Sequence, residues 1–296
     1  MRRHVILAAA FAALITAPPA RAEHKLNALA SFSILADLVR NVGGDRVIVD
    51  VLVGPDGNAH TYSPSPADAK KAAAANIVLV NGLGFEGWLE RLIKASGARA
   101  PIVVVSNGIR PRERAADHGH GAVDPHAWQS VANVKMYVTN IRAALTAVDP
   151  GGKAAYQSNT EAYLSKLDAL EQEVKDVIAG IPADRRNVIT SHNAFGYFED
   201  AYGIHFSAPQ GVSTDAEASA KDVAAIITQA RQQKAAGVFL ENVTDPRLVQ
   251  QIARETGSKV GGKLYSDALT DANGDAPSYI ALMRYNIKQL AGFATN

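Results

Sequence analysis

Three histidines and one aspartate stand where a polar side chain could meet a metal ion. They come from four separate segments, each at the end of a short apolar run or at the start of a helical one: His60, His126, His192 and Asp267. Imidazole nitrogens and carboxylate oxygens are common ligands of Zn²⁺, and three nitrogens with one oxygen make a complete tetrahedral shell. We therefore consider these four residues as candidate ligands of one divalent metal ion.

The local context of each histidine supports this interpretation. His60 follows the glycine- and proline-bearing stretch 54–59, directly after a β-branched run, and the carboxyl edge of a parallel sheet presents such loops. Pro125 precedes His126 and favours an extended backbone, and His192 ends the apolar run 188–190. Taken singly, each of these histidines is more often structural. Sequence spacing alone does not bring the four side chains together.

The elements that must position these residues are strands alternating with helices. Short apolar or β-branched runs predict strands, and continuous apolar strands between helices are typical of a parallel sheet covered on both faces. The expected strands are 26–32, 47–53, 77–80, 102–105, 187–190, 205–208, 237–240 and 259–265. Helices are expected at 34–41 and 67–75, and a helix-like run follows His126. The fold class is therefore α/β.

The segment 153–179 differs from the rest of the chain. Its buried-type residues recur every three or four positions, Gly151 and Gly152 precede it, and Gly180-Ile181-Pro182 ends it. This pattern predicts one helix about 40 Å long. We expect an N-terminal α/β lobe at 23–152, a linking helix at 153–180 and a C-terminal α/β lobe at 181–296.

The first residues predict export. Met1–His4 is basic, the following run to Ala17 is almost wholly apolar, and Ala20-Arg21-Ala22 matches a signal-peptidase site, so a signal peptide is expected at 1–22. The apolar run is shorter than a membrane-spanning helix requires, so the mature chain should be soluble. With no cysteine, the chain has neither a lipid-anchoring thiol nor thiolate metal sites.

Charge balance narrows the class of partner. There are 30 basic and 29 acidic residues, giving a formal net charge of +1. Binding to nucleic acid needs a concentrated basic surface, so this composition argues against nucleic acid as the main partner. The 47% hydrophobic content is enough for an ordinary core.

Six blocks of the sequence resemble the zinc- and manganese-specific solute-binding proteins of bacterial ABC importers. They occur in the family's order and cover essentially the whole mature chain: Gly54-Pro55-Asp56 with His60–Pro66, Asn81–Trp88, Asp124–Trp128, Ser191–Phe198, Gln210–Thr214 and Tyr265–Leu269. The resemblance implies two Rossmann-like lobes with parallel sheets, joined by one long rigid helix, with the metal between them. Carried over residue by residue, the family's ligands fall on His60, His126, His192 and Asp267.

The resemblance also implies a function and partners. The protein would act as a monomer in the periplasm, bind Zn²⁺ as cargo and pass it to a membrane permease served by a cytoplasmic ATPase. A periplasmic metallochaperone is a further candidate partner. His192 occupies the position where manganese-binding members usually carry a carboxylate, so zinc is favoured over manganese. A manganese- or iron-specific member of the same family is the alternative.

The loop before His126 departs from the family. Zinc-binding members often carry a long histidine- and acid-rich loop there, whereas this chain has only Asp117-His118-Gly119-His120 within the polar stretch 110–121. The stretch is expected to be an exposed loop. His118 and His120 either collect metal and pass it inward or belong to a solvated surface.

Three other functions fit parts of the sequence. Gly82–Gly87 satisfies G-x-G-x-x-G, but it does not follow the first strand, and the next strand ends in Ser106-Asn107 where a ribose-binding acid is expected, so a dinucleotide-binding oxidoreductase is disfavoured. A secreted zinc hydrolase would use Glu241 as a general base, but Asp267 would fill the position that water needs, and no H-E-x-x-H is present. Glu241 could equally support a ligand or cap a helix. The third function is that of an adhesin, but no segment of the sequence marks an adhesive surface.

Overall fold

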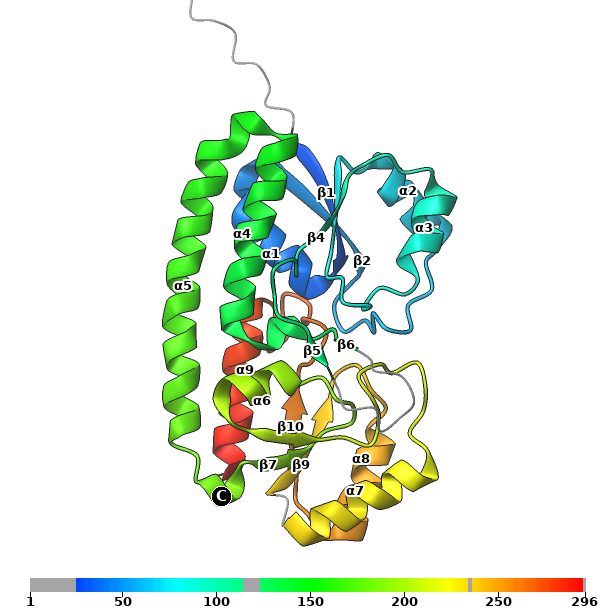
Figure 1. Ribbon diagram of the computed structural model, residues 1–296, viewed down its shortest axis with the longest axis vertical. Helices are drawn as coiled ribbons and strands as arrows, with labels where there is room; N and C mark the ends of the chain where they lie inside the picture. The colour runs from blue at the N-terminus through cyan, green and yellow to red at the C-terminus, as the bar shows by residue number, and fades with distance from the viewer. Residues whose placement is uncertain (1–24, 114–122, 234–235, 295–296) are drawn as a thin grey trace, which may run out of the picture.

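Two four-stranded parallel sheets form the upper and lower lobes in Figure 1. The computed structural model describes residues 25–113, 123–233 and 236–294. The expected signal peptide at 1–22 lies outside these ranges. No helix in the described ranges is long and apolar enough to span a membrane.

The upper lobe has the strand order β2-β1-β3-β4, with all neighbours parallel. Its strands are β1 (Leu26–Phe32), β2 (Val47–Val53), β3 (Ile77–Val80) and β4 (Ile102–Val104). Its helices are α1 (Ser33–Gly43), α2 (Pro66–Ala74), α3 (Leu89–Ser96) and α4 (Val131–Val148). The central strand β3 is buried along its whole length, as expected for a sheet covered on both faces.

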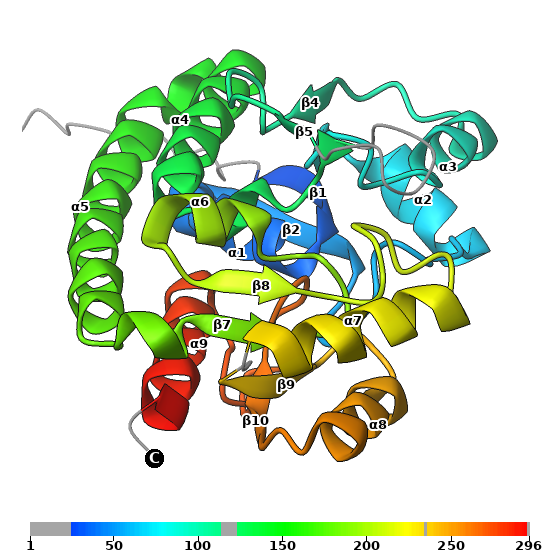
Figure 2. The same cartoon turned by 60° about the horizontal axis from the view of Figure 1, so that its bottom comes forward.

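The lower lobe has the order β10-β9-β7-β8, again parallel, and Figure 2 brings it forward. Its strands are β7 (Asn187–Ile189), β8 (His205–Ser207), β9 (Gly237–Glu241) and β10 (Val260–Leu264). Its helices are α6 (Gly196–Tyr202), α7 (Ala220–Gln233), α8 (Pro246–Thr256) and α9 (Tyr279–Ala294). Short 3-10 turns occupy Gly44–Arg46, Ala127–Gln129, Pro150–Gly152 and Ala183–Arg185.

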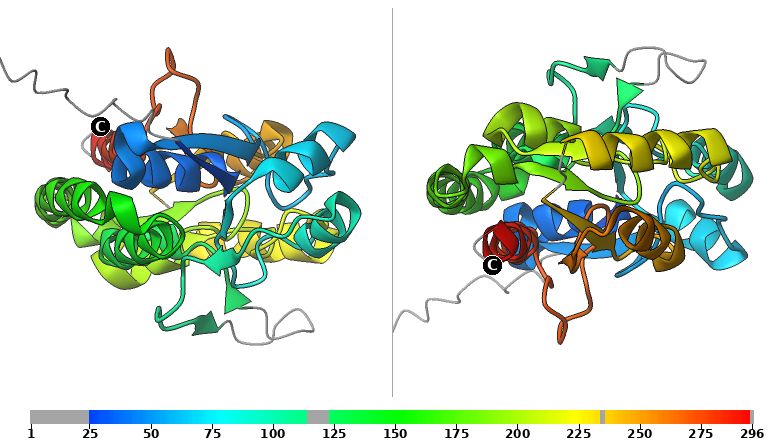
Figure 3. Two further views of the ribbon diagram at one scale, coloured as in Figure 1. Left: turned by 90° about the horizontal axis from the view of Figure 1, so that it is seen from above. Right: turned by 90° about the horizontal axis from the view of Figure 1, so that it is seen from below.

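The long helix α5 spans Lys153–Ala179 and runs beside both lobes (Figure 1). Its bounds are those expected from the sequence. One stripe of the helix is buried, at Tyr156, Thr160, Tyr163, Leu167, Leu170, Val174 and Ile178. This stripe packs against α1, α4 and α9, so the C-terminal helix lies along α5 (Figure 3). Burying this stripe in both lobes makes α5 a common support for them.

A two-residue antiparallel pair was not expected from the sequence. β5 (Arg112–Glu113) pairs with β6 (Val123–Asp124) on either side of residues 114–122, which lie outside the described ranges. The expected loop at 110–121 therefore contains a short strand near its start. The pair holds the chain just before His126.

Candidate metal site

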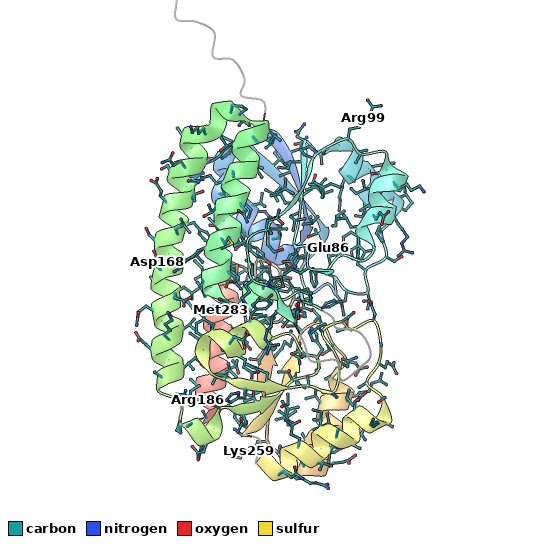
Figure 4. The ribbon with its side chains drawn as sticks, in the orientation of Figure 1. Glu86, Arg99, Asp168, Arg186, Lys259 and Met283 are labelled. Atoms are coloured by element: carbon teal, nitrogen blue, oxygen red, sulfur yellow. The ribbon has the colours of Figure 1, made fainter. Side chains whose placement is uncertain are left out.

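The four expected side chains meet between the two lobes. One ligating atom from each of His60, His126, His192 and Asp267 lies within 4.8 Å of all the others. The Nε2 atoms of His60 and His126 are 3.2 Å apart, and those of His60 and His192 lie 3.4 and 3.2 Å from Oδ2 of Asp267. Nε2 of His126 is 3.6 Å from Oδ1 of Asp267. Side chains of both lobes fill this boundary region, with Glu86 on its upper side (Figure 4).

The position of each ligand follows from the strand that precedes it. His60 lies in the loop after β2, and His126 follows β6 at the start of the 3-10 turn Ala127–Gln129. His192 comes just after β7 and forms a bridge with Gln210, and Asp267 comes just after β10. The ends of strands from both sheets therefore supply the site, as expected for ligands at the carboxyl edges of parallel sheets.

Two further carboxylates orient the histidines. Oδ1 of Asp124 lies 2.8 Å from Nδ1 of His126 and accepts a hydrogen bond from the His126 backbone amide. Oε2 of Glu241 lies 2.6 Å from Nδ1 of His192, while Oε1 accepts hydrogen bonds from the backbone amides of Ser191 and His192. A carboxylate at Nδ1 turns Nε2 toward the metal and increases its basicity. The sequence singled out Glu241 as a candidate, but it gave Asp124 no role.

Hydrogen bonds also join ligand-bearing segments of the two lobes. The side chains of Trp128 and Gln129, just after His126, both donate to the backbone oxygen of Ser266, at 2.9 and 2.8 Å. Ser266 precedes Asp267 in the chain. The spacing between His126 and Asp267 is thus fixed by neighbouring backbone as well as by packing.

Burial and charge set opposite protonation preferences within the site. Burial disfavours a charged His192, but Glu241 and Asp267 outweigh it and raise the His192 pKa well above its usual value. Burial likewise opposes the ionised form of Asp267, yet His192 and His126 hold the pKa of Asp267 well below its usual value. For His60, burial dominates and lowers the pKa. These shifts favour a protonated His192 beside an ionised Asp267 in the metal-free site.

The buried polar atoms of this site are not satisfied by the protein. Both carboxylate oxygens of Asp267 and Nε2 of His192 lack a well-aligned hydrogen-bond partner in the part of the chain that the structure describes. Buried polar atoms in native proteins almost always have a partner. Their position in one cluster of metal-ligating side chains fits a cation, which is the chemistry that this donor set supports.

Aromatic rings close one side of the site. Phe85 packs edge-on against His60 with ring centroids 4.8 Å apart, and Trp128 packs against His126 at 5.2 Å. Phe85 belongs to the loop Gly82–Gly87, in which Gly82, Leu83 and Gly84 have positive φ angles. Such rings exclude water and lower the local dielectric constant, which strengthens interactions between charges.

The glycine loop does not offer a phosphate cradle. The Glu86 carboxylate accepts hydrogen bonds from the backbone amides of Asn81 and Gly82 and from the Ser31 hydroxyl. A dinucleotide phosphate would need such amides to be free. Burial raises the pKa of Glu86, and this internal carboxylate fixes the loop that carries Phe85.

A cavity of about 640 Å³ lies mainly against the C-terminal lobe, with Asn58 also lining it, whereas a smaller one of about 470 Å³ reaches the metal site. The smaller cavity is lined on one side by His60, Gly84, Phe85 and Gly87, and on the other by segment 212–215. His60 is 8% exposed, whereas His126, His192 and Asp267 are fully buried. The cavity therefore leads to the site past His60.

Comparison with known proteins places this geometry in a family. Residues 29–292 match the family described as zinc-uptake complex component A, periplasmic (ZnuA). The chain belongs to this family. It is a periplasmic metal-binding component of an ABC importer, and the substrate-binding proteins to which it is related are not enzymes.

The names of individual relatives refer to different metals. The iron-binding protein YfeA of Yersinia pestis is 32% identical over 95% of this chain and 90% of its own length. The manganese ABC transporter substrate-binding lipoprotein PsaA of Streptococcus pneumoniae is 29% identical over 90% of this chain and 88% of its own.

Solved structures show the same fold. A manganese-bound periplasmic metal binding protein from Candidatus Liberibacter asiaticus matches with a TM-score of 0.83 and 30% identity, covering 91% of this chain and 100% of that one. The periplasmic zinc binding protein TroA from Treponema pallidum matches with a TM-score of 0.85 and 28% identity, covering 91% and 99%. The expected fold class, with two lobes and one long helix, is confirmed.

The structure does not describe every residue that the sequence singled out. His118 and His120 lie outside the described ranges. Arg112 was missed altogether, although it contacts Asp124. Asp124 could have been found, because an acid two residues before a candidate ligand can reach the ring nitrogen that faces away from the metal.

Proposed function

We propose that the protein captures Zn²⁺ in the periplasm through His60, His126, His192 and Asp267 and delivers it to the permease of an ABC importer. The observation that carries this proposal is the donor geometry. A tetrahedral zinc ion with bonds of about 2.0–2.1 Å separates its ligand atoms by about 3.3 Å. Four distances between donor atoms of different ligands are 3.2, 3.2, 3.4 and 3.6 Å; two of them end at Oδ2 of Asp267 and the longest at its Oδ1. One ligating atom from each residue lies within 4.8 Å of all the others.

Ligand chemistry supports zinc for the same reason. Three imidazoles make a nitrogen-rich shell, and manganese is the harder ion, suited to carboxylate, carbonyl and water ligands. Manganese also stands at the weak end of the divalent affinity series, whereas zinc stands near its strong end. The carboxylates of Asp267, Asp124 and Glu241 provide the negative charge that a buried dication requires.

The alternative is a manganese or iron cargo. The names of YfeA and PsaA favour it, since these relatives are about as similar to this chain as the zinc-binding TroA is. These names describe those proteins, and His192 is the residue in this chain that separates the two possibilities. With four protein ligands, the shell leaves no position for a reactive water, which supports capture and transfer in preference to hydrolysis.

Delivery requires partners and a path. The family implies a permease with its ATPase, and we expect a monomeric binding protein; loading by a metallochaperone stays an expectation. We propose that metal enters and leaves past His60 through the 470 Å³ cavity, because His60 alone among the four ligands lines it. Release would require His60 or segment 212–215 to move away.

Single alanine substitutions test the ligand set. We expect His60→Ala, His126→Ala, His192→Ala and Asp267→Ala each to weaken zinc binding, measured by competition with a chelator of known affinity. The wild-type protein should bind one zinc ion tightly. Wild-type affinity in the His60→Ala or His192→Ala protein would refute the proposed shell.

A further inference from the structure

Arg112 contacts both sides of the metal site from outside it. The residue lies on β5, its Nε donates to Oδ2 of Asp200 on α6 at 3.0 Å, and its Nη1 lies 3.7 Å from Oδ2 of Asp124. Its backbone amide donates to the hydroxyl of Tyr197, also on α6, at 2.9 Å. Arg112 thus joins the upper lobe to the first helix after the His192 loop.

The guanidinium of Arg112 provides a positive charge beside the buried carboxylate of Asp124. Asp124 is fully buried, and its Oδ1 is used by the backbone and ring of His126. Its Oδ2 has no hydrogen-bond partner within the ranges 25–113, 123–233 and 236–294. A buried carboxylate is costly unless it is paired, and at 3.7 Å the partly exposed guanidinium of Arg112 is close enough to attract it.

Gly196 allows the close approach on the α6 side. A Cβ atom at this position would lie 2.5 Å from Oδ2 of Asp124 and would also overlap the guanidinium of Arg112. Gly196 is the first residue of α6, and the chain reaches it shortly after His192. The contact between Arg112 and Asp124 therefore requires a glycine at the start of α6.

The charges of the assembled site also include Arg112. Three buried carboxylates surround the ligands: Asp124, Glu241 and Asp267. With neutral imidazoles, a bound dication balances two of these three negative charges. The guanidinium of Arg112 lies next to the third, on Asp124, and it also pairs with Asp200.

We infer that Arg112 is a positioning residue for metal binding: it holds Asp124, and through Asp124 the His126 ring, while its bond to Asp200 couples that ring to α6 of the other lobe. This role rests on the proposed ligand set. It assigns Arg112 no direct contact with metal, and it makes the affinity of the site sensitive to the packing of α6 against β5.

A double-mutant cycle tests the inference. Arg112→Gln and Asp124→Asn should each weaken zinc binding, by about tenfold or more, the range seen when groups supporting a metal-bound histidine are removed. If Arg112 acts through Asp124, the double variant should bind little worse than Asp124→Asn alone. Arg112→Lys should recover part of the loss, because it keeps the charge but not the planar fork.

Two further measurements separate positioning from general destabilisation. The absorption spectrum of the cobalt-substituted protein should change in Arg112→Gln, because it reports the ligand geometry directly. Arg284→Gln, which removes an exposed pair with Glu173, should leave both affinity and spectrum unchanged. Gly196→Ala should reproduce the Arg112→Gln phenotype without removing any charge, and it replaces that variant if Arg112→Gln does not fold.

Distinct outcomes identify which idea fails. Fully additive losses in the double variant, or wild-type affinity and an unchanged cobalt spectrum in Arg112→Gln, would overturn the role of Arg112. If the wild-type protein binds zinc no more tightly than it binds manganese, the proposal that zinc is the cargo fails. The same cycle measured with manganese then still decides whether Arg112 acts through Asp124.

Discussion

Replacing Glu241 by glutamine should weaken metal binding although Glu241 does not touch the metal. Its Oε1 accepts hydrogen bonds from the backbone amides of Ser191 and His192, and its Oε2 makes an ionic contact of 2.6 Å with Nδ1 of His192. Glutamine has one oxygen and one NH₂ group. Whichever way the amide is turned, a donor must face either the two backbone amides or a ring nitrogen that should donate.

The expected loss follows from this mismatch. Leaving one buried polar group unsatisfied costs about 1–3 kcal/mol. That cost corresponds to about a 10–100-fold loss of zinc affinity, which is also the range observed for groups that support metal-bound histidines. If the glutamine turns its oxygen toward His192, the cost falls mainly on the backbone amides of the loop and appears as lower stability of the metal-free protein.

The assay is chelator competition for zinc, together with the unfolding free energy of the metal-free protein. Glu255→Gln is the matched control, because Glu255 lies in the same lobe on the exposed side of α8, where its carboxylate accepts a hydrogen bond from the Gln251 side chain. The reasoning is refuted if Glu241→Gln keeps both zinc affinity and metal-free stability within the scatter of this control.

Three further predictions concern protons, access and the fold. Zinc binding at pH 7 should release about one proton, because the raised pKa keeps His192 protonated without metal, and affinity should rise with pH until that pKa is passed; calorimetry in two buffers of different ionisation enthalpy measures this. Release of no proton would contradict the assigned charge state. Gly87→Phe, which places a ring where a Cβ meets nothing within 4 Å, should slow zinc uptake and release alike, by about tenfold, with a smaller change in Kd in stopped-flow measurements. Unchanged rates would place the path elsewhere. Burial opposes ionisation of Asp68, but bonds from Ser65, Tyr62 and Lys71 lower its pKa to about 2, so Asp68→Asn should cost about 1 kcal/mol of unfolding free energy at pH 7 after allowance for solvent screening. Because the ionised form is the stabilising one, the difference should fade as the pH falls from about 4 toward 2, and a difference that persists at pH 2 would show that charge is not its source.

Much of the fold could be predicted because its signals are local. The β-branched run 47–53 became β2 with the expected bounds, and the three- and four-residue spacing in 153–179 became α5. The positions of the metal ligands could be predicted for a related reason. Parallel strands place their carboxyl ends together, and family resemblance indicated which of the loop residues to choose.

Contacts between distant segments have no such local signal. The contact of Arg112 with Asp200 spans 88 residues, and neither residue stands in an apolar or helical pattern that marks it. The packing of Phe85 on His60 depends on three consecutive positive φ angles in the loop before it, which the glycines permit but do not specify. The short pairing of β5 with β6 likewise contains too few residues for a period to be recognised.

Competition between zinc and manganese for the metal-free protein tests the central claim most directly, with His192→Glu measured beside the wild type. A shell of three imidazoles and one carboxylate should bind zinc more tightly, and zinc should displace bound manganese. In His192→Glu the shell is harder and more anionic, so the preference for zinc should narrow. If the wild-type protein binds zinc no better than manganese, or if His192→Glu leaves the preference unchanged, the assignment of zinc through His192 is contradicted.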